Sequence, residues 1–179
     1  LSVQVHPDDK YALLHEGESG KTEMWYVMDA TPDATLIYGF THEISHQEFE
    51  RRIKDNTLLE VCNQVPIKKG DVFFIEAGTL HAIGAGALIA EIQQSSNSTY
   101  RVYDYGRVGK DGKLRELHIE KALAVTKLEP PTRKPEPIAK LTAFADYDLT
   151  ILAQCKLFNV SHFDLHGNCS LNAKKDSFH

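Results

Sequence analysis

Three side chains able to bind a metal ion lie close together near the start of the sequence. Gln4 and His6 stand two residues apart in "QVHPDD", and Glu23 opens the apolar run "EMWYVM". Residues two apart on a β-strand point to the same side of a sheet, so Glu23 could meet both from a neighbouring strand. A histidine beside a glutamate is, however, more often a hydrogen-bonded structural pair, so this segment alone leaves both interpretations open.

The elements that must position these residues belong to a globular chain. Its 179 residues are 42% hydrophobic and 25% charged, close to the averages of globular proteins, so a sizeable core is expected. The net charge of −5 argues against a nucleic-acid partner and means that an anionic substrate needs a locally positive pocket. No run approaches the roughly 18 apolar residues of a membrane span, so we expect no membrane partner.

The cysteines predict a reducing compartment. Cys62, Cys155 and Cys169 are odd in number and have no close partner along the sequence, a pattern typical of reduced thiols rather than of a disulfide framework. We therefore expect the protein in the cytoplasm. Because the sequence starts at Leu1 directly in a strand-like pattern and ends in "KKDSFH", we also expect a segment of a longer protein. The oligomeric state stays open, and a monomer is compatible with the sequence.

Short runs rich in β-branched and aromatic residues dominate residues 1–107. Gly, Pro, Asp and Asn separate these runs, which is typical of a β-sandwich or barrel. One helix is expected among them in "SHQEFERRIKDN", where Ser45 and Glu48 form a capping-box pattern and Phe49 and Ile53 share one face. The expected strands are 1–5, 23–28, 34–40, 70–78, 87–93 and 99–106.

Residues 108–137 have a different composition. The segment "KLEPPTRKPEPIAK" holds four of the seven prolines, which excludes it from a sheet interior and predicts an extended connector over the surface. "HIEKALAV" could form two helical turns within it. Strand-like alternation returns from residue 138, so we expect an all-β protein in which residues 138–179 begin a second, incomplete β domain.

The segment "GDVFFIEAGTLHAIG" resembles the second metal-binding motif of the cupin barrel, with Gly-x-x-His at 78–81. The opening segment resembles the first motif, in the variant where Gln-x-His replaces His-x-His and a later Glu completes the set. Glu76 stands where cupins usually have proline, which affects a turn but no ligand. The resemblance implies a cupin (jelly-roll) barrel in each of the two domains, and a metal site formed by Gln4, His6, Glu23 and His81.

A narrower resemblance follows from four segments in order. "LSVQVHPDD", "GKTEMWYV", "AGTLHAI" and "IAEIQQSSNSTYRVYDYGR" resemble type I mannose-6-phosphate isomerase in its compact bacterial form, over residues 1–107. Members interconvert mannose 6-phosphate and fructose 6-phosphate with one metal ion. The resemblance therefore implies a phosphorylated hexose as substrate and one Zn²⁺ per chain, with manganese, iron and cobalt as other metals that accept nitrogen and oxygen ligands.

The same resemblance assigns further site residues. Glu91 takes the place of a proposed acid–base carboxylate, and Arg101 that of the catalytic arginine. Lys21 matches a pocket lysine with a catalytic or substrate-binding role, and Ser2 matches a serine near the phosphate. Thr22 departs from the family's Lys-Pro-Glu pattern without removing either functional residue. Which of the two cations contacts the phosphate stays open.

Several of these residues also have ordinary structural explanations. Glu91 could point outward from its strand, Arg101 could pair with Asp104 on the surface, and Lys21 could be an exposed turn lysine. His162 and His166 have ligand-like spacing but no carboxylate placed to complete a set.

Two other functions are compatible with a cupin. Two histidines and a glutamate could form the iron site of an oxygenase, although a fourth ligand and two cations argue against it. A sugar-binding cupin without catalysis is the other alternative, and it should have lost a ligand or the arginine.

These assignments make separable predictions for two substitutions. We expect His81→Ala to abolish both metal binding and isomerase activity, because it removes a ligand. We expect Arg101→Ala to keep the metal and lose turnover, because it removes only a charge that stabilises the enediolate or the phosphate. Metal analysis and isomerase kinetics on both variants test this, and full activity of Arg101→Ala would refute the proposed mechanism.

Overall fold

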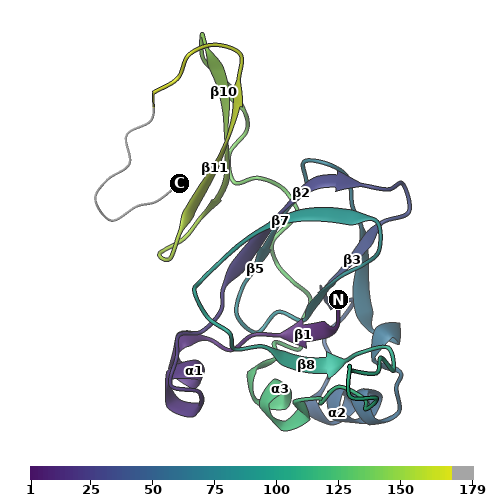
Figure 1. The fold of residues 1–179 in the computed structure, drawn as a ribbon. Coiled ribbons are helices and arrows are strands. Elements are labelled where there is room, and N and C mark those ends of the chain that lie inside the picture. The colour runs from purple at the N-terminus through teal and green to yellow at the C-terminus, as the bar shows by residue number, and fades with distance from the viewer. Residues whose placement is uncertain (171–179) are drawn as a thin grey trace. The chain divides into compact units, whose positions relative to one another are not determined.

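The computed structural model describes residues 1–170 and divides the chain into two units, Leu1–Pro135 and Glu136–His179 (Figure 1). The last nine residues of the predicted second domain lie outside the described residues. The helices and strands are β1 (Val3–Val5), α1 (Asp9–His15), β2 (Glu23–Ala30), β3 (Thr35–Phe40), α2 (His46–Lys54), the 3-10 helix η1 (Leu58–Glu60), β4 (Cys62–Pro66), β5 (Val72–Ile75), β6 (His81–Ile83), β7 (Ala87–Gln93), β8 (Tyr100–Tyr103), α3 (Ile119–Val125), β9 (Thr142–Ala143), β10 (Tyr147–Gln154) and β11 (Asn159–Leu165).

Two antiparallel sheets form the first unit. One has the strand order β4-β3-β6-β1-β8, and the other has the order β5-β2-β7. Apolar side chains from both sheets make one core cluster, including Trp25 and Phe73 from the smaller sheet and Leu36 and Tyr38 from the larger. The Tyr38 hydroxyl also donates a hydrogen bond of 3.0 Å to the Phe74 carbonyl across the sheets. The all-β prediction is confirmed.

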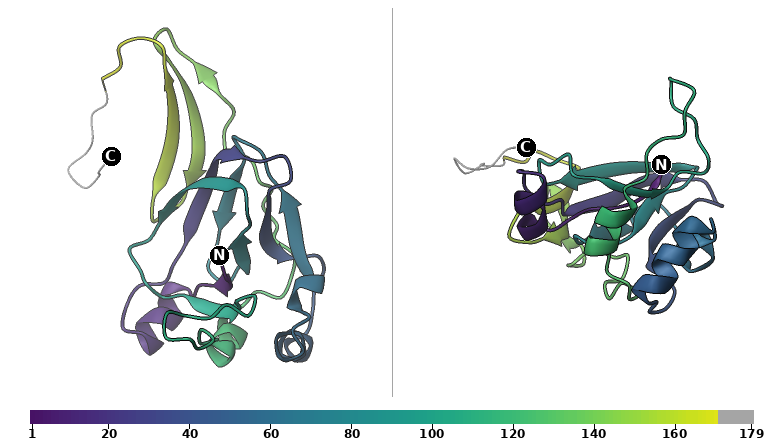
Figure 2. Two further views of the ribbon diagram at one scale, coloured as in Figure 1. Left: turned by 45° about the vertical axis from the view of Figure 1, so that its right-hand side comes forward. Right: turned by 90° about the horizontal axis from the view of Figure 1, so that it is seen from below.

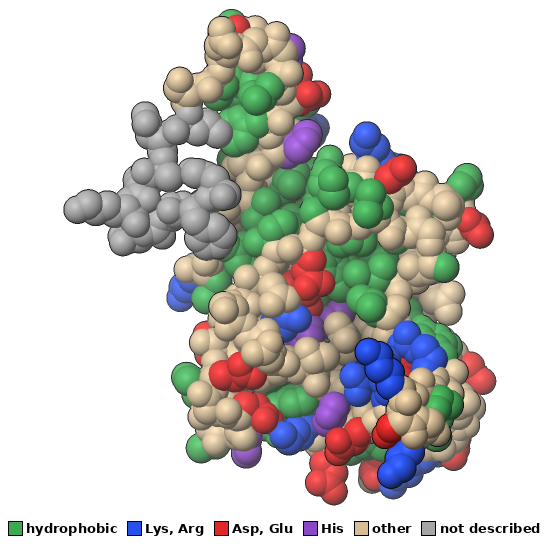
Figure 3. Space-filling view, viewed as in Figure 1, with side chains coloured by type: hydrophobic (Ala, Val, Ile, Leu, Met, Phe, Trp, Pro, Cys, Tyr) green, Lys and Arg blue, Asp and Glu red, His purple; other side chains and the backbone are tan. Residues whose placement is uncertain are grey.

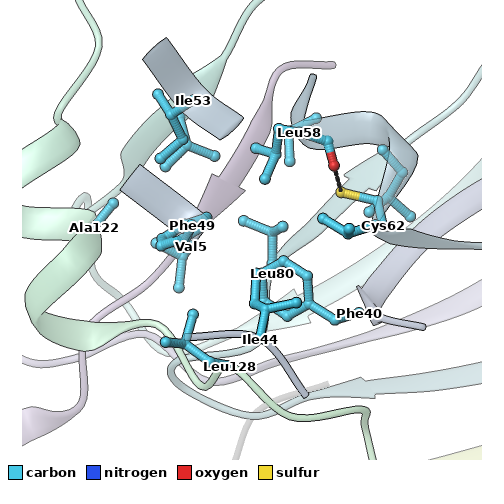
Figure 4. Packing of buried hydrophobic residues seen from close by; sticks show 14 of the residues in the cluster. Val5, Phe40, Ile44, Phe49, Ile53, Leu58, Cys62, Leu80, Ala122 and Leu128 are labelled. Carbon is cyan, nitrogen blue, oxygen red and sulfur yellow. Dashed lines mark hydrogen bonds between the residues drawn. The ribbon is translucent and has the colours of Figure 1, made fainter. Parts of the chain in front are cut away.

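A second core cluster lies between the larger sheet and the helices, which gather at one end of the unit (Figures 1 and 2). The predicted helix is confirmed as α2, with the Ser45 side chain accepting from the Glu48 amide and with Phe49 and Ile53 buried. Figure 4 shows Phe49 and Val5 facing Leu80 and neighbouring apolar side chains. Within residues 1–170, no helix is long and apolar enough to cross a membrane.

Other elements escaped the sequence analysis. Residues 9–15 form helix α1 rather than a simple turn, since the Asp8 side chain accepts from the Tyr11 amide and so caps a helix. Strands β4 and β6 were also missed. Both are short, and β6 acquires its strand geometry by pairing with β1 and β3.

Residues 108–135 belong to the first unit. Asp104, which is buried at the end of β8, binds the guanidinium groups of Arg107 and Arg115. Further along, α3 confirms the two predicted helical turns, and the Lys127 amide donates to the Gly78 carbonyl over 2.8 Å. This segment therefore closes one end of the barrel unit.

The second unit contains a three-stranded antiparallel sheet in the order β11-β10-β9. Its longest pairing joins β10 and β11, from Tyr147 opposite Leu165 to Gln154 opposite Asn159. The strand-like alternation expected after residue 138 thus corresponds to strands. Its assignment to an incomplete cupin-like domain, with boundaries at 107 and 137, stays a prediction.

Strand register brings the candidate site residues together. Because β1 lies between β6 and β8, Gln4 is the cross-strand partner of both His81 and Arg101. In the smaller sheet β2 lies between β5 and β7, which makes Trp25 the partner of Glu91. Directly paired residues project from the same face of a sheet, so each pair shares a face.

The Asp104 cluster gives a pH-dependent prediction. The pKa of the Asp104 carboxyl is lowered from 3.8 to about 2. The hydrogen bond from Arg115 is the largest cause, and Arg107 adds to it. A carboxyl whose pKa is lower in the folded than in the unfolded state stabilises the fold at pH values above the unfolded-state pKa. This stabilisation is lost as the pH falls toward the folded-state pKa of about 2. We therefore expect Asp104→Asn to lower the free energy of unfolding at pH 7, by a difference that shrinks between pH 4 and 2.

Denaturant unfolding at several pH values measures that difference. Ser45→Ala is the matched control, since loss of this helix cap costs about 1 kcal/mol through a group that does not titrate. An Asp104→Asn effect that is as independent of pH as the Ser45→Ala effect would contradict the account.

Candidate metal centre

The structure brings His6, Glu23 and His81 together from three separate segments. His6 follows β1, Glu23 begins β2 and His81 begins β6. Nε2 of His6 lies 2.6 Å from Oε1 of Glu23 and 3.1 Å from Nε2 of His81, which is itself 3.3 Å from the same carboxylate oxygen. All three side chains are buried, with at most 1% of their surface exposed.

Backbone carbonyls fix the tautomer of both histidines. Nδ1 of His6 lies 2.9 Å from the Ser98 carbonyl, and Nδ1 of His81 lies 2.8 Å from the Thr79 carbonyl. A carbonyl oxygen can only accept, so each Nδ1 carries the proton and donates. In the neutral form of each ring, Nε2 then carries the lone pair and directs it toward Glu23, which is how outer-shell carbonyls orient metal-binding imidazoles.

This arrangement fits a divalent cation. Within residues 1–170, both carboxylate oxygens of Glu23 are buried without a hydrogen-bond donor. Two lone pairs and a carboxylate that face one another repel unless a positive charge lies between them. The three ligand atoms lie within 4.8 Å of one another, and this is the single such group of His, Cys, Asp or Glu in the described part of the chain. His162 and His166 form no comparable group there.

The protonation of His6 is compatible with this role. Burial, the largest influence, lowers the pKa of His6 to about 4, although Glu23 acts in the opposite direction. The ring is therefore neutral at pH 7, as a metal ligand must be.

Gln4 lies beside this group. Its Nε2 is 3.4 Å from Nε2 of His81, its cross-strand partner. A half-turn of the amide exchanges nitrogen for oxygen and presents Oε1 to the same point.

Two further charged residues lie next to Glu23. Lys21 is only 8% exposed, with Nζ 4.0 Å from Oε2 of Glu23, so the alternative of an exposed turn lysine is wrong. Glu91 is solvent-exposed, yet its Oε2 accepts a hydrogen bond of 3.0 Å from Nε1 of Trp25. Partial burial, and after it the negative charge of Glu23, raise the pKa of Glu91. Figure 3 shows acidic, basic and histidine side chains beside one another near the centre of the viewed face.

Arg101 lies on β8 and shares a sheet face with Gln4. Its Nη1 donates to the Glu116 carbonyl over 2.8 Å, and its backbone amide donates to Nδ1 of His118 over 3.1 Å. Nε of Arg101 is buried without a partner in the part of the chain that the structure describes. The alternative pairing of Arg101 with Asp104 is not found there, where Asp104 binds two other arginines.

Comparisons with known proteins show which proteins this chain resembles. No family model matches the chain. Over 176 residues, 98% of the chain, it is 43% identical to mannose-6-phosphate isomerase ManA of Bacillus subtilis (strain 168), and over 172 residues it is 41% identical to the mannose-6-phosphate isomerase of Streptococcus mutans. Over almost its whole length, this chain is similar to proteins named mannose-6-phosphate isomerase.

The solved structures of the mannose-6-phosphate isomerase family agree with this. The crystal structure of the Bacillus subtilis enzyme matches 93% of the chain with a TM-score of 0.85 and 38% identity. A putative mannosephosphate isomerase from Archaeoglobus fulgidus, with a TM-score of 0.60 and 22% identity, supports the fold alone. The cupin prediction is confirmed. The chain covers 55% of the first of these relatives in sequence and 52% of the first structure, so it spans about half their length.

Some residues near the metal group lay beyond sequence reasoning. Ser2 is buried directly before β1, but no side-chain hydrogen bond joins it to the histidines within residues 1–170. The carbonyls of Thr79 and Ser98 act through the backbone and leave no signal in residue type. Trp25 did carry a signal, because it follows Glu23 by two residues and so faces the same side of β2.

The cluster predicts a stability response to metal. A ligand present at about 100 times its dissociation constant adds about 2.7 kcal/mol to the free energy of unfolding. We expect zinc added to the chelated protein to raise the unfolding temperature, and Glu23→Ala to lose most of this increase. Glu48→Gln, which changes a carboxylate on α2, serves as control and should keep it. An equal increase in Glu23→Ala would show that zinc binds elsewhere.

Proposed function

We propose that this chain carries the catalytic site of a mannose-6-phosphate isomerase, which interconverts mannose 6-phosphate and fructose 6-phosphate through a cis-enediol. One observation carries the proposal. His6, Glu23 and His81 converge with their lone pairs directed at one point, in a chain 41% to 43% identical to proteins named for this reaction.

Zinc is our first choice of cofactor, one ion per chain. His6, Glu23 and His81 would hold it, with Gln4 as the fourth ligand. Two imidazole nitrogens and two oxygens suit zinc, and they are also accepted by manganese, iron and cobalt. When bound, the ion supplies Lewis-acid polarisation of the sugar oxygens next to the carbon that loses its proton.

Glu91 acts as the general base in this proposal. Its carboxylate takes the proton from the carbon beside the carbonyl and returns it to the neighbouring carbon, while a second proton moves between the two oxygens. Two features support it. Glu91 is accessible to a substrate while it contacts the metal group through Trp25 and Glu23, and its raised pKa is closer to neutral pH than that of an ordinary glutamate.

Lys21 and Arg101 supply the positive charges that a chain of net charge −5 otherwise lacks at this site. Between them they neutralise the enediolate and bind the phosphate, and Ser2 contributes to the phosphate contact. The unpartnered Nε of Arg101 supports this role, because a buried guanidinium donor normally has an acceptor.

The site favours an isomerase over the two alternative functions. A sugar-binding cupin without catalysis has no need of an acid–base carboxylate beside the metal group. An iron-dependent oxygenase of the facial-triad type keeps open coordination positions, and Gln4 as a fourth ligand would fill one of them. We infer a cytoplasmic location, which the free thiols of Cys62, Cys155 and Cys169 support.

The direct test is isomerase activity of the whole protein on mannose 6-phosphate, followed through fructose 6-phosphate. We expect activity to vanish after chelation and to return when zinc is restored. Mannose without its phosphate is the control substrate and should react far more slowly, because Lys21 and Arg101 then lack a partner. No turnover of mannose 6-phosphate with zinc demonstrably bound would contradict the proposal.

A further inference from the structure

Trp25 is the single tryptophan of the sequence, and it lies inside the candidate site rather than in a remote part of the core. It follows Glu23 by two residues on β2 and is 1% exposed. Its surroundings include the core cluster between the two sheets, with Val27 and Phe73. An indole buried in this way keeps one orientation.

The indole contacts two parts of the site at once. Its Nε1 donates a 3.0 Å hydrogen bond to Oε2 of Glu91, the cross-strand partner of Trp25. Its ring meets the His81 ring edge-on, with 5.2 Å between the centroids and 77° between the planes. One rigid side chain therefore joins a metal-binding imidazole to the carboxylate beside it.

The exposed side chain of Glu91 gains from such a support. The residue is exposed, and a glutamate side chain has three rotatable bonds. A bond from a buried donor selects one of its orientations and occupies Oε2. Oε1 then remains available to take a proton from a substrate.

We propose that Trp25 is a positioning residue. Its indole N–H holds the Glu91 carboxylate at a fixed position relative to His81 in the metal centre. The inference rests on the proposed function, since it assigns Glu91 the proton transfer. Trp25 itself touches no reacting atom in this account. Its effect is on the rate of the proton transfer rather than on substrate affinity or metal binding.

Trp25→Phe tests this, because phenylalanine keeps an aromatic ring beside His81 and removes the N–H. Because hydrogen bonds to charged groups are among the stronger ones, we expect the loss of this bond to lower kcat about tenfold or more. We expect KM to change less than about twofold and the zinc content to stay the same. An unchanged kcat, or a loss of zinc that accounts for the lower kcat, would overturn the inference.

Tyr38→Phe is the matched control. Tyr38 belongs to the same core cluster and is 4% exposed, and its hydroxyl donates to the Phe74 carbonyl rather than to Glu91. The substitution thus removes one buried aromatic donor from the same core. We expect the kcat of Tyr38→Phe to stay within about twofold of that of the original protein. An equal loss of kcat in Tyr38→Phe and Trp25→Phe would overturn the inference, because general destabilisation of the core would then explain both.

A double-mutant cycle shows whether Trp25 acts through Glu91. In the Glu91→Ala background, whose residual rate is the reference, Trp25→Phe should cause no further loss of kcat. An additional loss as large as in the original protein would overturn the inference. So would a Glu91→Ala variant with full activity, because Trp25 would then have no catalytic carboxylate to position.

A spectroscopic measurement separates this inference from the proposed function. In a ¹⁵N-labelled protein, the indole N–H resonance that Trp25→Phe removes should shift in Glu91→Ala. This readout requires no turnover. An indole resonance that does not move in Glu91→Ala would overturn the contact between Trp25 and Glu91. A protein that binds zinc but has no isomerase activity would refute the proposed function, and the resonance would still test the contact.

Discussion

Two imidazole nitrogens and one carboxylate oxygen, all buried, face one another in the first unit, with their lone pairs opposed when both rings are neutral. His6, Glu23 and His81 are held in this repulsive arrangement by the backbone, since the carbonyls of Ser98 and Thr79 accept the only ring protons that could relieve it. Such a group is stable when a cation lies between its members. The strand pairings of the barrel serve this constraint, because β1 and β6 bring the histidines together and β2 carries the carboxylate to them.

The other charged side chains of the site lie around His6, Glu23 and His81. Lys21 approaches one side of Glu23, and Glu91 lies over the same region with one oxygen bound by Trp25. Arg101 stands further along the row that Gln4 and His81 form across the larger sheet. Gln4, His81 and Arg101 thus belong to the larger sheet, whereas Glu23 and Glu91 belong to the smaller one.

The sequence predicted the parts of this arrangement that depend on residue type. Strand alternation placed Gln4 and His6 on one face but left the role of the segment open, and the ligand set came from the cupin resemblance. Helix α2 was recognisable because Ser45 and Glu48 mark its start. The missing parts depend on long-range contacts. Helix α1 escaped because Asp8 suits a turn and a helix cap equally well. The two carbonyls that set the histidine tautomers, and the contact of the Glu116 carbonyl with Arg101, involve backbone atoms that residue type does not reveal.

The central claim is that His6 and His81 bind the metal through Nε2 while Nδ1 keeps its proton. Long-range ¹H–¹⁵N spectra of the protein with ¹⁵N-labelled histidine, before and after zinc is added, test it most directly. The account predicts a protonated Nδ1 in both rings throughout and a large shift of both Nε2 resonances with zinc. A protonated Nε2 in either ring of the zinc-loaded protein, or rings that do not respond to zinc, would contradict it.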